Sequence, residues 1–395
     1  MTTRARVTVT WPEANARRID RQGLSAAPPP AVRDRRAPAL RTPADVAGAM
    51  LGVHAQVLSA AELSVAVRLP GTTRTDVREA LWTDRTLVKT FGPRGTVHLL
   101  PADELPLWTG ALSALPAGPG RLAESARLTP DRTEQVVAAV ADALTGTDLT
   151  IDELSDAVVA RTGSWAADPV VPGFQGMWPR WRQVMHLAGH RGVLCYGPDR
   201  GRKATYTNPG HTPLPGPEAM TALVGRYLRA YGPATPAHFA KWLATAPGWA
   251  NRLFADLAES GAIEEVTYED APAWVAAGDT DFPAEPAPGV RLLPYFDAFT
   301  IASQPRERLF PGRAYTRALG RGQAGNYPVL LVDGTVAGVW HQRRSGRRIA
   351  VTVEPLEPLT AGQLRELDEQ VERVAVAMEG KAELTVGTVT VGPHA

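Results

Sequence analysis

The stretch that decides the fold is Thr42-Pro-Ala-Asp-Val-Ala-Gly-Ala-Met-Leu-Gly-Val-His-Ala-Gln-Val-Leu-Ser-Ala-Ala-Glu62. Thr42 followed by Pro43 is typical of a helix start, because the Thr side chain caps free backbone N–H groups and Pro fits the first helical position. Ser59 with Glu62 three residues later is a capping box, which predicts a second helix start near residue 60. The stretch therefore predicts two helices with a short joint between them.

His54 and Gln56 lie in that joint. If the joint is extended, alternation of side chains places both residues on one side, away from their apolar neighbours. Two polar side chains presented together from an apolar joint are a candidate functional pair. The simpler alternative is that they are two polar residues capping helix ends.

Composition excludes some classes of protein. The chain has 395 residues, 44% hydrophobic and 21% charged, which is ordinary for a globular protein. No run of apolar residues is long enough to span a membrane, and the N-terminus lacks the apolar core of a signal peptide, so we expect a cytoplasmic protein. The single Cys195 excludes an internal disulfide and a cysteine-based zinc site.

The cations are mostly arginine, with 38 Arg and 4 Lys at a net charge of +1. A GC-rich genome explains this bias, and so does phosphate binding, for which the guanidinium group is well suited. Composition cannot separate the two explanations.

Helices followed by a β-hairpin occur three times, which is the order of elements in a winged helix. The first hairpin turns at Gly-Pro-Arg-Gly, residues 92–95, and the second has a basic tip at 197–202. We expect the third helix of the second copy to cover 176–190, and the hairpin of the third copy is the least clear. The predicted winged helices cover residues 42–120, 121–215 and 216–284.

The two ends of the chain differ from this pattern. Residues 1–24 predict a helix of the first module, and the Pro- and Arg-rich residues 25–41 predict a flexible connector. Residues 285–395 predict an antiparallel β-domain, barrel-like and partly closed, with Asp333-Gly334 as a type I′ turn. The predicted fold class is α+β.

These segments resemble the AlkZ-like winged-helix DNA glycosylases over nearly the whole chain. Each motif is weak alone, but their order and spacing are specific. The motifs are Gln22-Gly-Leu24, Leu51-Gly-Val-His-Ala-Gln56, Arg94-Gly-Thr-Val-His98 with Asp103 and Trp108, Tyr231-Gly-Pro-Ala-Thr235 with Phe239 and Trp242, Leu292-Leu-Pro-Tyr-Phe-Asp297 with Arg306, and Asp333-Gly334 with Gly338 and Trp340. The resemblance implies tandem winged helices, a C-terminal β-domain and excision of alkylated purines from DNA, including bulky adducts of genotoxic natural products.

The family's catalytic pair is usually Gln-x-Gln or Gln-x-Asp, and His54 and Gln56 occupy its two positions here. An N7-alkylated guanine is already a good leaving group, so the enzyme must mainly place a water beneath C1′. We expect Gln56 to hold that water and neutral His54 to act as its general base. Excision should then rise with pH through a His54 pKa near or above 6.5.

The chemistry needs no cofactor, and the eight scattered His suggest no metal site. No lysine lies near residues 54–56 in sequence, although folding could bring Lys89 close, so we expect a monofunctional enzyme without AP-lyase activity. The expected partner is double-stranded DNA containing an alkylated purine, bound by a monomer associated with the nucleoid. His54 further suggests a subgroup for one bulky adduct, such as self-resistance in an antibiotic producer.

Further candidates come from the hairpins and the C-terminal region. Each of these candidates has a simpler explanation without a functional role. The second hairpin is then a solvated tip, His98 has a structural role, and Asp297 belongs to a buried ion pair. The expected DNA-binding residues are Arg94, Arg200, Arg202 and Lys203, and the expected supporting residues are His98, Asp297, Arg306 and Arg308.

A second function fits the same modules, since winged helices also occur in transcriptional regulators that catalyse nothing. A regulator has no need of a polar pair at residues 54 and 56, and it would typically dimerise on a palindromic site. No heptad segment for dimerisation is present. We therefore favour the glycosylase.

Overall fold

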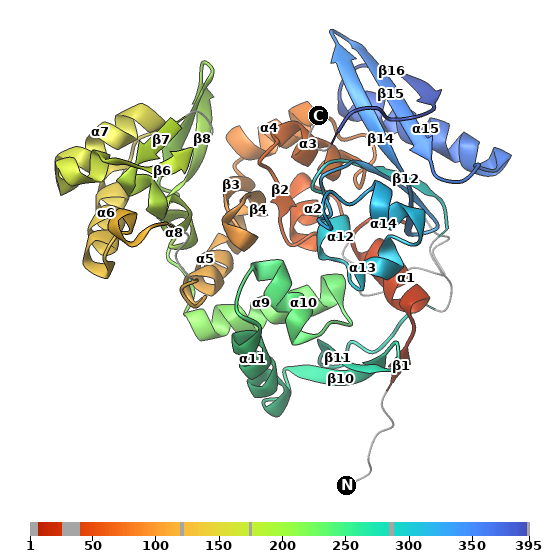
Figure 1. Ribbon diagram of the computed structural model, residues 1–395, viewed down its shortest axis with the longest axis horizontal. Helices are drawn as coiled ribbons and strands as arrows, with labels where there is room; N and C mark the ends of the chain where they lie inside the picture. Colours follow the sequence, from red (N-terminus) through yellow and green to blue (C-terminus); the bar gives the residue numbers. More distant parts are fainter. Residues whose placement is uncertain (1–6, 26–39, 119–121, 174–175, 284–287, 393–395) are drawn as a thin grey trace.

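The computed structural model describes residues 7–25, 40–118, 122–173, 176–283 and 288–392 (Figure 1). Most of the predicted connector, residues 26–39, lies outside them. Helices and small sheets alternate up to about residue 276, and a five-stranded sheet follows. The fold is thus α+β, as predicted.

The first group of elements carries the stretch quoted above. Its members are β1 (Thr8–Val9), α1 (Trp11–Arg21), α2 (Pro43–Ala49), β2 (Val53–His54), α3 (Leu58–Ala66), α4 (Arg74–Trp82), β3 (Leu87–Phe91), β4 (Val97–Pro101) and α5 (Leu105–Ser113). Strands β2, β4 and β3 form an antiparallel sheet in that order.

Both predicted helices are present, as α2 and α3, with a short joint between them. The Thr42 hydroxyl accepts a hydrogen bond from the backbone N–H of Asp45, 3.1 Å away, so Thr42 caps α2. The predicted capping box at Ser59 is wrong, because α3 begins at Leu58 after Val57. Glu62 does not reach back to the helix start, since its buried carboxylate pairs with α4.

The second group comprises α6 (Pro130–Ala143), β5 (Leu149–Thr150), α7 (Ile151–Thr162), β6 (Pro169–Gly173), β7 (Gly176–Pro179), α8 (Met185–His190), β8 (Cys195–Arg200) and β9 (Lys203–Thr207). The helix predicted over 176–190 is wrong in its first half, where β7 and a 3-10 turn precede α8. The φ of Gly176 is 128°, far from helical, and Pro179 disfavours a helical residue before it.

The third group comprises α9 (Gly216–Tyr231), α10 (Pro236–Leu243), α11 (Pro247–Glu259), β10 (Ile263–Tyr268) and β11 (Ala271–Ala276). Strands β10 and β11 form the hairpin that was unclear in sequence, and β1 adds to β10 in parallel. The element order of the three groups is that expected for winged helices, and this assignment stays a prediction.

Helix α1, which we assigned to the first module, forms polar contacts with the third group and with the C-terminal region. The buried guanidinium of Arg18 donates hydrogen bonds to the carbonyls of Tyr231, Pro233 and Gln304 at 2.7–3.1 Å. Arg21 forms a buried ion pair with Asp279. The N-terminal helix therefore ties the third group to the C-terminal region.

The C-terminal region contains β12 (Val290–Leu293), α12 (Ala298–Ala302), α13 (Arg306–Leu309), α14 (Arg313–Arg317), β13 (Val329–Val332), β14 (Thr335–Ser345), β15 (Arg348–Pro355), α15 (Ala361–Ala377) and β16 (Lys381–Val386). The turn at Asp333 and Gly334 has φ of 49° and 80°, both positive as a type I′ turn requires.

The prediction of an antiparallel sheet is wrong for its last strand. The order is β12-β13-β14-β15-β16, and β16 runs parallel to β15. Helix α15 connects these two strands, and a helical crossover is the usual way to join parallel neighbours. Among the described strands β12 and β16 are the two edges, so the sheet is open.

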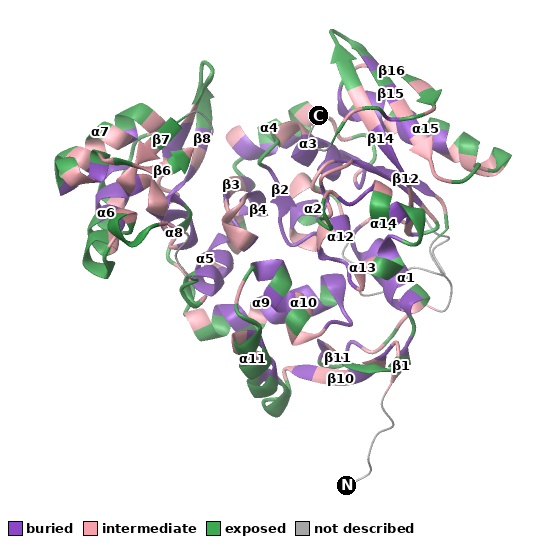
Figure 2. Cartoon of the chain, viewed as in Figure 1, coloured by how far each residue is buried: buried purple, intermediate pink, exposed green. Residues whose placement is uncertain are grey.

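The first group and the C-terminal region share a core. Leu63 and Val67 at α3 belong to the same buried apolar cluster as Leu292 and Val351 of the large sheet. Figure 2 shows β2 and β12 buried, whereas α6 and α7 carry broad exposed faces. Buried surface is thus concentrated around β2, where His54 lies.

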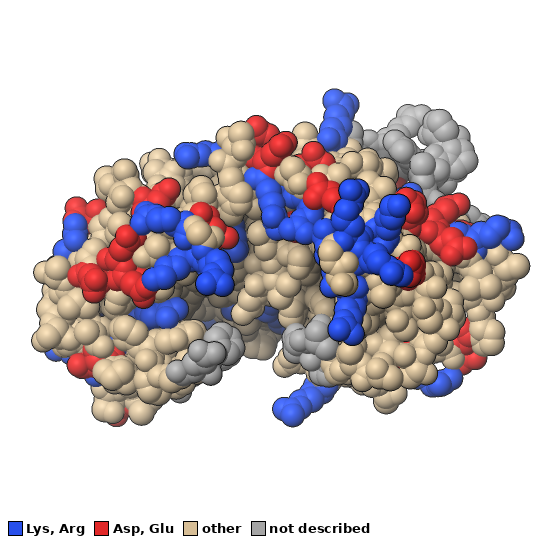
Figure 3. Space-filling view, turned by 90° about the horizontal axis from the view of Figure 1, so that it is seen from above, with Lys and Arg blue, Asp and Glu red and all other residues tan. Residues whose placement is uncertain are grey.

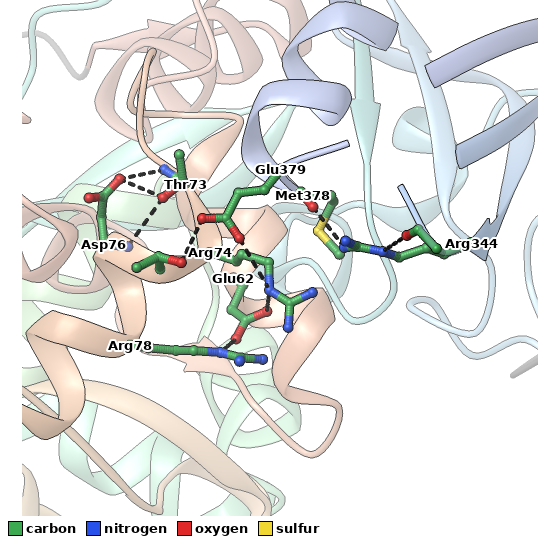
Figure 4. A network of polar contacts seen from close by, with 10 residues as sticks. Glu62, Thr73, Arg74, Asp76, Arg78, Arg344, Met378 and Glu379 are labelled. Atoms are coloured by element: carbon green, nitrogen blue, oxygen red, sulfur yellow. Dashed lines mark hydrogen bonds and ion pairs between the residues drawn. The ribbon is translucent and has the colours of Figure 1, made fainter. Parts of the chain in front are cut away.

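A polar network also links the first group to the C-terminal region (Figure 4). The Arg78 guanidinium donates to the buried Glu62 carboxylate at 2.6 Å, and Arg74 lies within 4.0 Å of both Glu62 and Glu379. The Thr75 hydroxyl donates to Glu379 at 2.6 Å. Helices α3 and α4 are therefore linked to the turn after α15, which connects the part of the chain that carries His54 to the C-terminal region.

Candidate active site

The joint between α2 and α3 is a sharp turn into a short strand. Leu51 and Gly52 have φ of 55° and 91°, and Gly52 is the residue type that adopts such a φ without strain. The Tyr231 hydroxyl donates to the carbonyl of Met50 at 2.6 Å and holds the end of α2. Strand β2 then pairs with β4, which sets His54 opposite His98.

The His54 ring is almost fully buried, with 7% of its surface exposed. It stacks on Phe296 with ring centroids 4.5 Å apart, and it meets the edge of His98 at 5.3 Å. Its Nδ1 is buried and has no hydrogen-bond partner among the described residues. Phe296 has a φ of 56°, which is rare for an aromatic residue and is typical of backbone constrained at a functional site.

Burial, together with the smaller effect of the positive charge of Arg94, lowers the pKa of His54 to about 4. His54 is therefore neutral at pH 7 and keeps one ring nitrogen as an acceptor. The expected pKa near or above 6.5 is wrong for the protein without DNA. A buried imidazole loses the hydration that stabilises its charged form, and this loss is invisible in the sequence.

His98 is the buried neighbour of His54. Its Nδ1 lies 2.9 Å from the Thr96 carbonyl, so Nδ1 carries the proton and donates it to that oxygen. Burial, with the nearby His54 and Arg94, lowers the pKa of His98 well below its ordinary value. Two glycines leave room for the ring, since a Cβ at Gly52 or Gly92 would lie 3.3 Å or less from it.

Gly92→Ala tests this arrangement. The new Cβ would come within 2.9 Å of the His98 ring, so we expect the free energy of unfolding to fall by about 1–3 kcal/mol. Urea denaturation measures this change. Gly248→Ala is the control, because its Cβ would meet only Arg252 at 3.9 Å. Its stability should not fall, and it should rise by up to about 1 kcal/mol because Ala favours the helix α11. Equal stability of both variants would show that the His98 ring is free to move aside.

A pocket with a volume of about 630 Å³ opens beside His54. Its polar lining includes His54, Gln56, Arg94, His238, Lys241 and Arg306, and its apolar lining includes Val57, Trp242, Phe296 and Ile301. Gln56 is exposed at this pocket, next to the buried His54. The fold thus brings together four predicted residues, His54, Gln56, Arg94 and Arg306, from three separate regions. It adds His238 and Lys241, which no sequence motif indicated.

Arg94 lies in the turn between β3 and β4, where the first hairpin was predicted, and its side chain lines the pocket. Arg94 has a φ of 62°, and its guanidinium donates a hydrogen bond to the Trp242 carbonyl at 2.9 Å. The turn that carries Arg94 packs against α10. It also packs against His186, which would lie 3.6 Å from a Cβ added to Gly95. Burial lowers the pKa of Arg94, and no carboxylate pairs with it among the described residues.

Asp297 and Arg308 do not line this pocket. Asp297 is fully buried, pairs with Arg68 at 2.7 Å and accepts from the backbone N–H of Phe299. Asp297 therefore forms the buried ion pair that we considered as the alternative. Its carboxylate also caps α12, directly after Phe296. Arg308 is exposed and pairs with Glu269.

The basic hairpin β8–β9 lies away from the pocket. Arg200 donates to both oxygens of Glu153 at 2.8 and 3.0 Å, and Lys203 pairs with Asp152 at 2.7 Å. Arg202 is exposed, and no ion pair involves it in the part of the chain that the structure describes. Helix α7 therefore already neutralises much of this hairpin's charge.

The family model described as "DNA glycosylase AlkZ-like" matches residues 47–376, which include the joint, the pocket and most of the large sheet. The chain belongs to the AlkZ-like DNA glycosylase family. A family member from Streptomyces sahachiroi, named "Interstrand DNA cross-link repair glycosylase", is 32% identical over 349 residues, which are 84% of this chain and 87% of that protein.

The solved structure of the Streptomyces sahachiroi DNA glycosylase AlkZ has a similar fold. It matches with a TM-score of 0.78 and 28% identity, covering 96% of this chain and all of that one. The resemblance stated from the motifs is thereby confirmed for this AlkZ-like protein. None of its described helices is long and apolar enough to cross a membrane, and none of its described His, Cys, Asp and Glu residues form a group that could hold a metal ion.

Proposed function

We propose that this AlkZ-like protein is a monofunctional DNA glycosylase that removes bulky N7-alkylguanine adducts by hydrolysis of the N-glycosidic bond. The observation that carries the proposal is the pair formed by neutral His54 and exposed Gln56 at a pocket lined by cations. The relative's name adds a further expectation, that adducts linked into DNA cross-links are among its substrates.

The reaction needs little from the protein. Water attacks C1′ of the damaged nucleotide while the bond from C1′ to N9 breaks, and the bonding electrons neutralise the cationic purine. Gln56 holds the water through its amide oxygen, and neutral His54 accepts the proton that the water loses. The stack on Phe296 and the contact with His98 keep the imidazole in one orientation.

The direct test is incubation of the protein with duplex DNA containing N7-alkylguanine, followed by chromatography of released bases. A monofunctional glycosylase should release the base and leave an abasic strand that breaks only after alkali treatment. Binding without base release would instead favour the non-catalytic DNA-binding protein. Strand breakage without alkali would contradict the monofunctional mechanism.

DNA is also expected to contact the β8–β9 hairpin. Figure 3 views the side of the molecule to which this hairpin points, where Lys and Arg gather on both sides of a hollow between the two lobes. Acidic side chains lie among them. We propose Arg94 for contact near the lesion, and Arg200, Arg202 and Lys203 for the phosphate backbone.

Arg200→Ala with Arg202→Ala should weaken binding to damaged and undamaged DNA alike. The log–log salt dependence should flatten by up to about 0.9 per lost phosphate contact. Most of the effect should come from Arg202, because Arg200 is already paired with Glu153. Arg365→Ala, on the exposed face of α15, is the control. A slope equal to that of the control would remove the hairpin from the DNA interface.

A further inference from the structure

Lys241 is a cation that the fold adds to the pocket of His54 and Gln56. It lies on α10, and its side chain shares the pocket with Arg306 of α13. Burial and the neighbouring Arg306 lower the pKa of Lys241, while the carboxylate of Glu307 acts in the opposite direction. The two cations are therefore close enough to repel each other.

Arg306 is held by backbone carbonyls, and no carboxylate among the described residues forms an ion pair with it. Its guanidinium donates to the carbonyls of Ile301 and Gly322, both at 3.1 Å. Its Nε is buried and has no hydrogen-bond partner among the described residues. Arg94, on the same pocket, is likewise bonded to a carbonyl and not to an acid. Partly buried cations without matching acids are costly, and a bound anion offsets that cost.

The anion cannot be the base that the enzyme removes. An N7-alkylated purine is itself cationic, so three cations would repel it, and its flat face suits the aromatic surfaces of Trp242 and Phe296. The phosphodiester on either side of the damaged nucleotide is the anion that must come with it. Arg offers paired donors to phosphate oxygens, and Lys offers a compact charge.

We propose that Lys241 and Arg306 clamp the phosphodiester next to the excised nucleotide and thereby hold C1′ over the water of His54 and Gln56. This inference rests on the proposed function. The proposed clamp acts on a nucleotide turned out of the duplex into the pocket, so it should strengthen binding at a lesion and add nothing on undamaged DNA. It differs in this respect from the β8–β9 hairpin, which should act on both.

The test compares two probes, a duplex with one tetrahydrofuran abasic-site analogue and the same duplex without it. Lys241→Ala should bind the analogue duplex roughly tenfold more weakly. Its salt slope on that duplex should fall by about 0.9, while binding to the undamaged duplex stays as in the wild type. Lys241→Arg should restore most of the difference, and Glu307→Gln should tighten binding to the analogue.

Two results would overturn the clamp. One is wild-type affinity and salt slope of Lys241→Ala on the analogue duplex. The other is an equal loss on both duplexes, which would make Lys241 a general DNA contact. Base release by the wild type separates this failure from failure of the proposed function, because an enzyme that releases N7-alkylguanine with an indifferent Lys241 contradicts the clamp alone.

Discussion

Gln56→Ala should nearly abolish base release while leaving DNA binding nearly intact. Gln56 is exposed at the pocket and contributes nothing to the buried core, so its loss should not unfold the protein. Its proposed work is on the attacking water and not on phosphates. Removing one positioned hydrogen-bonding group from a reacting centre typically slows the reaction by roughly 10²–10³-fold. Single-turnover release of N7-alkylguanine measures the loss.

Gln323→Ala is the matched control, because Gln323 is an exposed glutamine on the same pocket. It should keep most of the wild-type rate. Wild-type release by Gln56→Ala would remove Gln56 from catalysis. An equal loss in both variants would show that general polarity of the pocket, and not a water held by Gln56, is what matters.

His54→Ala should slow excision by roughly 10²–10⁴-fold, as is typical when a positioned base is lost. His54→Gln restores the usual family pair, so it should keep part of the activity, because an amide orients water at any pH near neutral. Either substitution changes the packing beside Phe296, so circular dichroism and thermal unfolding should be used to check that each variant is still folded. A fully active His54→Ala would place His54 outside the reaction.

The pH dependence follows from the same residue. The pKa of His54 lies at about 4, so the ring is neutral above that pH and active as an acceptor. Excision should be flat between about pH 6 and 8 and should fall as the pH decreases toward 4. DNA phosphates favour the charged imidazole, so the falling limb in the complex should lie above the value for the free protein.

Acid also removes N7-alkylguanine without enzyme, so the uncatalysed release at each pH must be subtracted. His54→Gln should lose the acidic limb while keeping activity. An acidic limb that persists in His54→Gln would assign the titration to another group, such as His238, whose pKa burial also lowers to about 4.

Local signals determined much of the framework. Thr42 caps a helix as predicted, because capping involves only residues within one turn. Asp333 and Gly334 form the predicted turn for the same reason, since their positive φ values depend on the two residues themselves. The six motifs spread over nearly the whole chain together sufficed to indicate the family, because their order and spacing are visible without a fold.

Tertiary structure alone decided the contents of the pocket and the protonation of His54. Lys241 joins Gln56 only because α10 packs beside the turn of Arg94, and no local pattern encodes that contact. The pKa of His54 depends on how much water the surrounding chain excludes, and the direction of β16 depends on where α15 crosses the sheet. The burial of a side chain and the charges around it depend on residues that are distant in sequence. Both are therefore set only when the chain has folded.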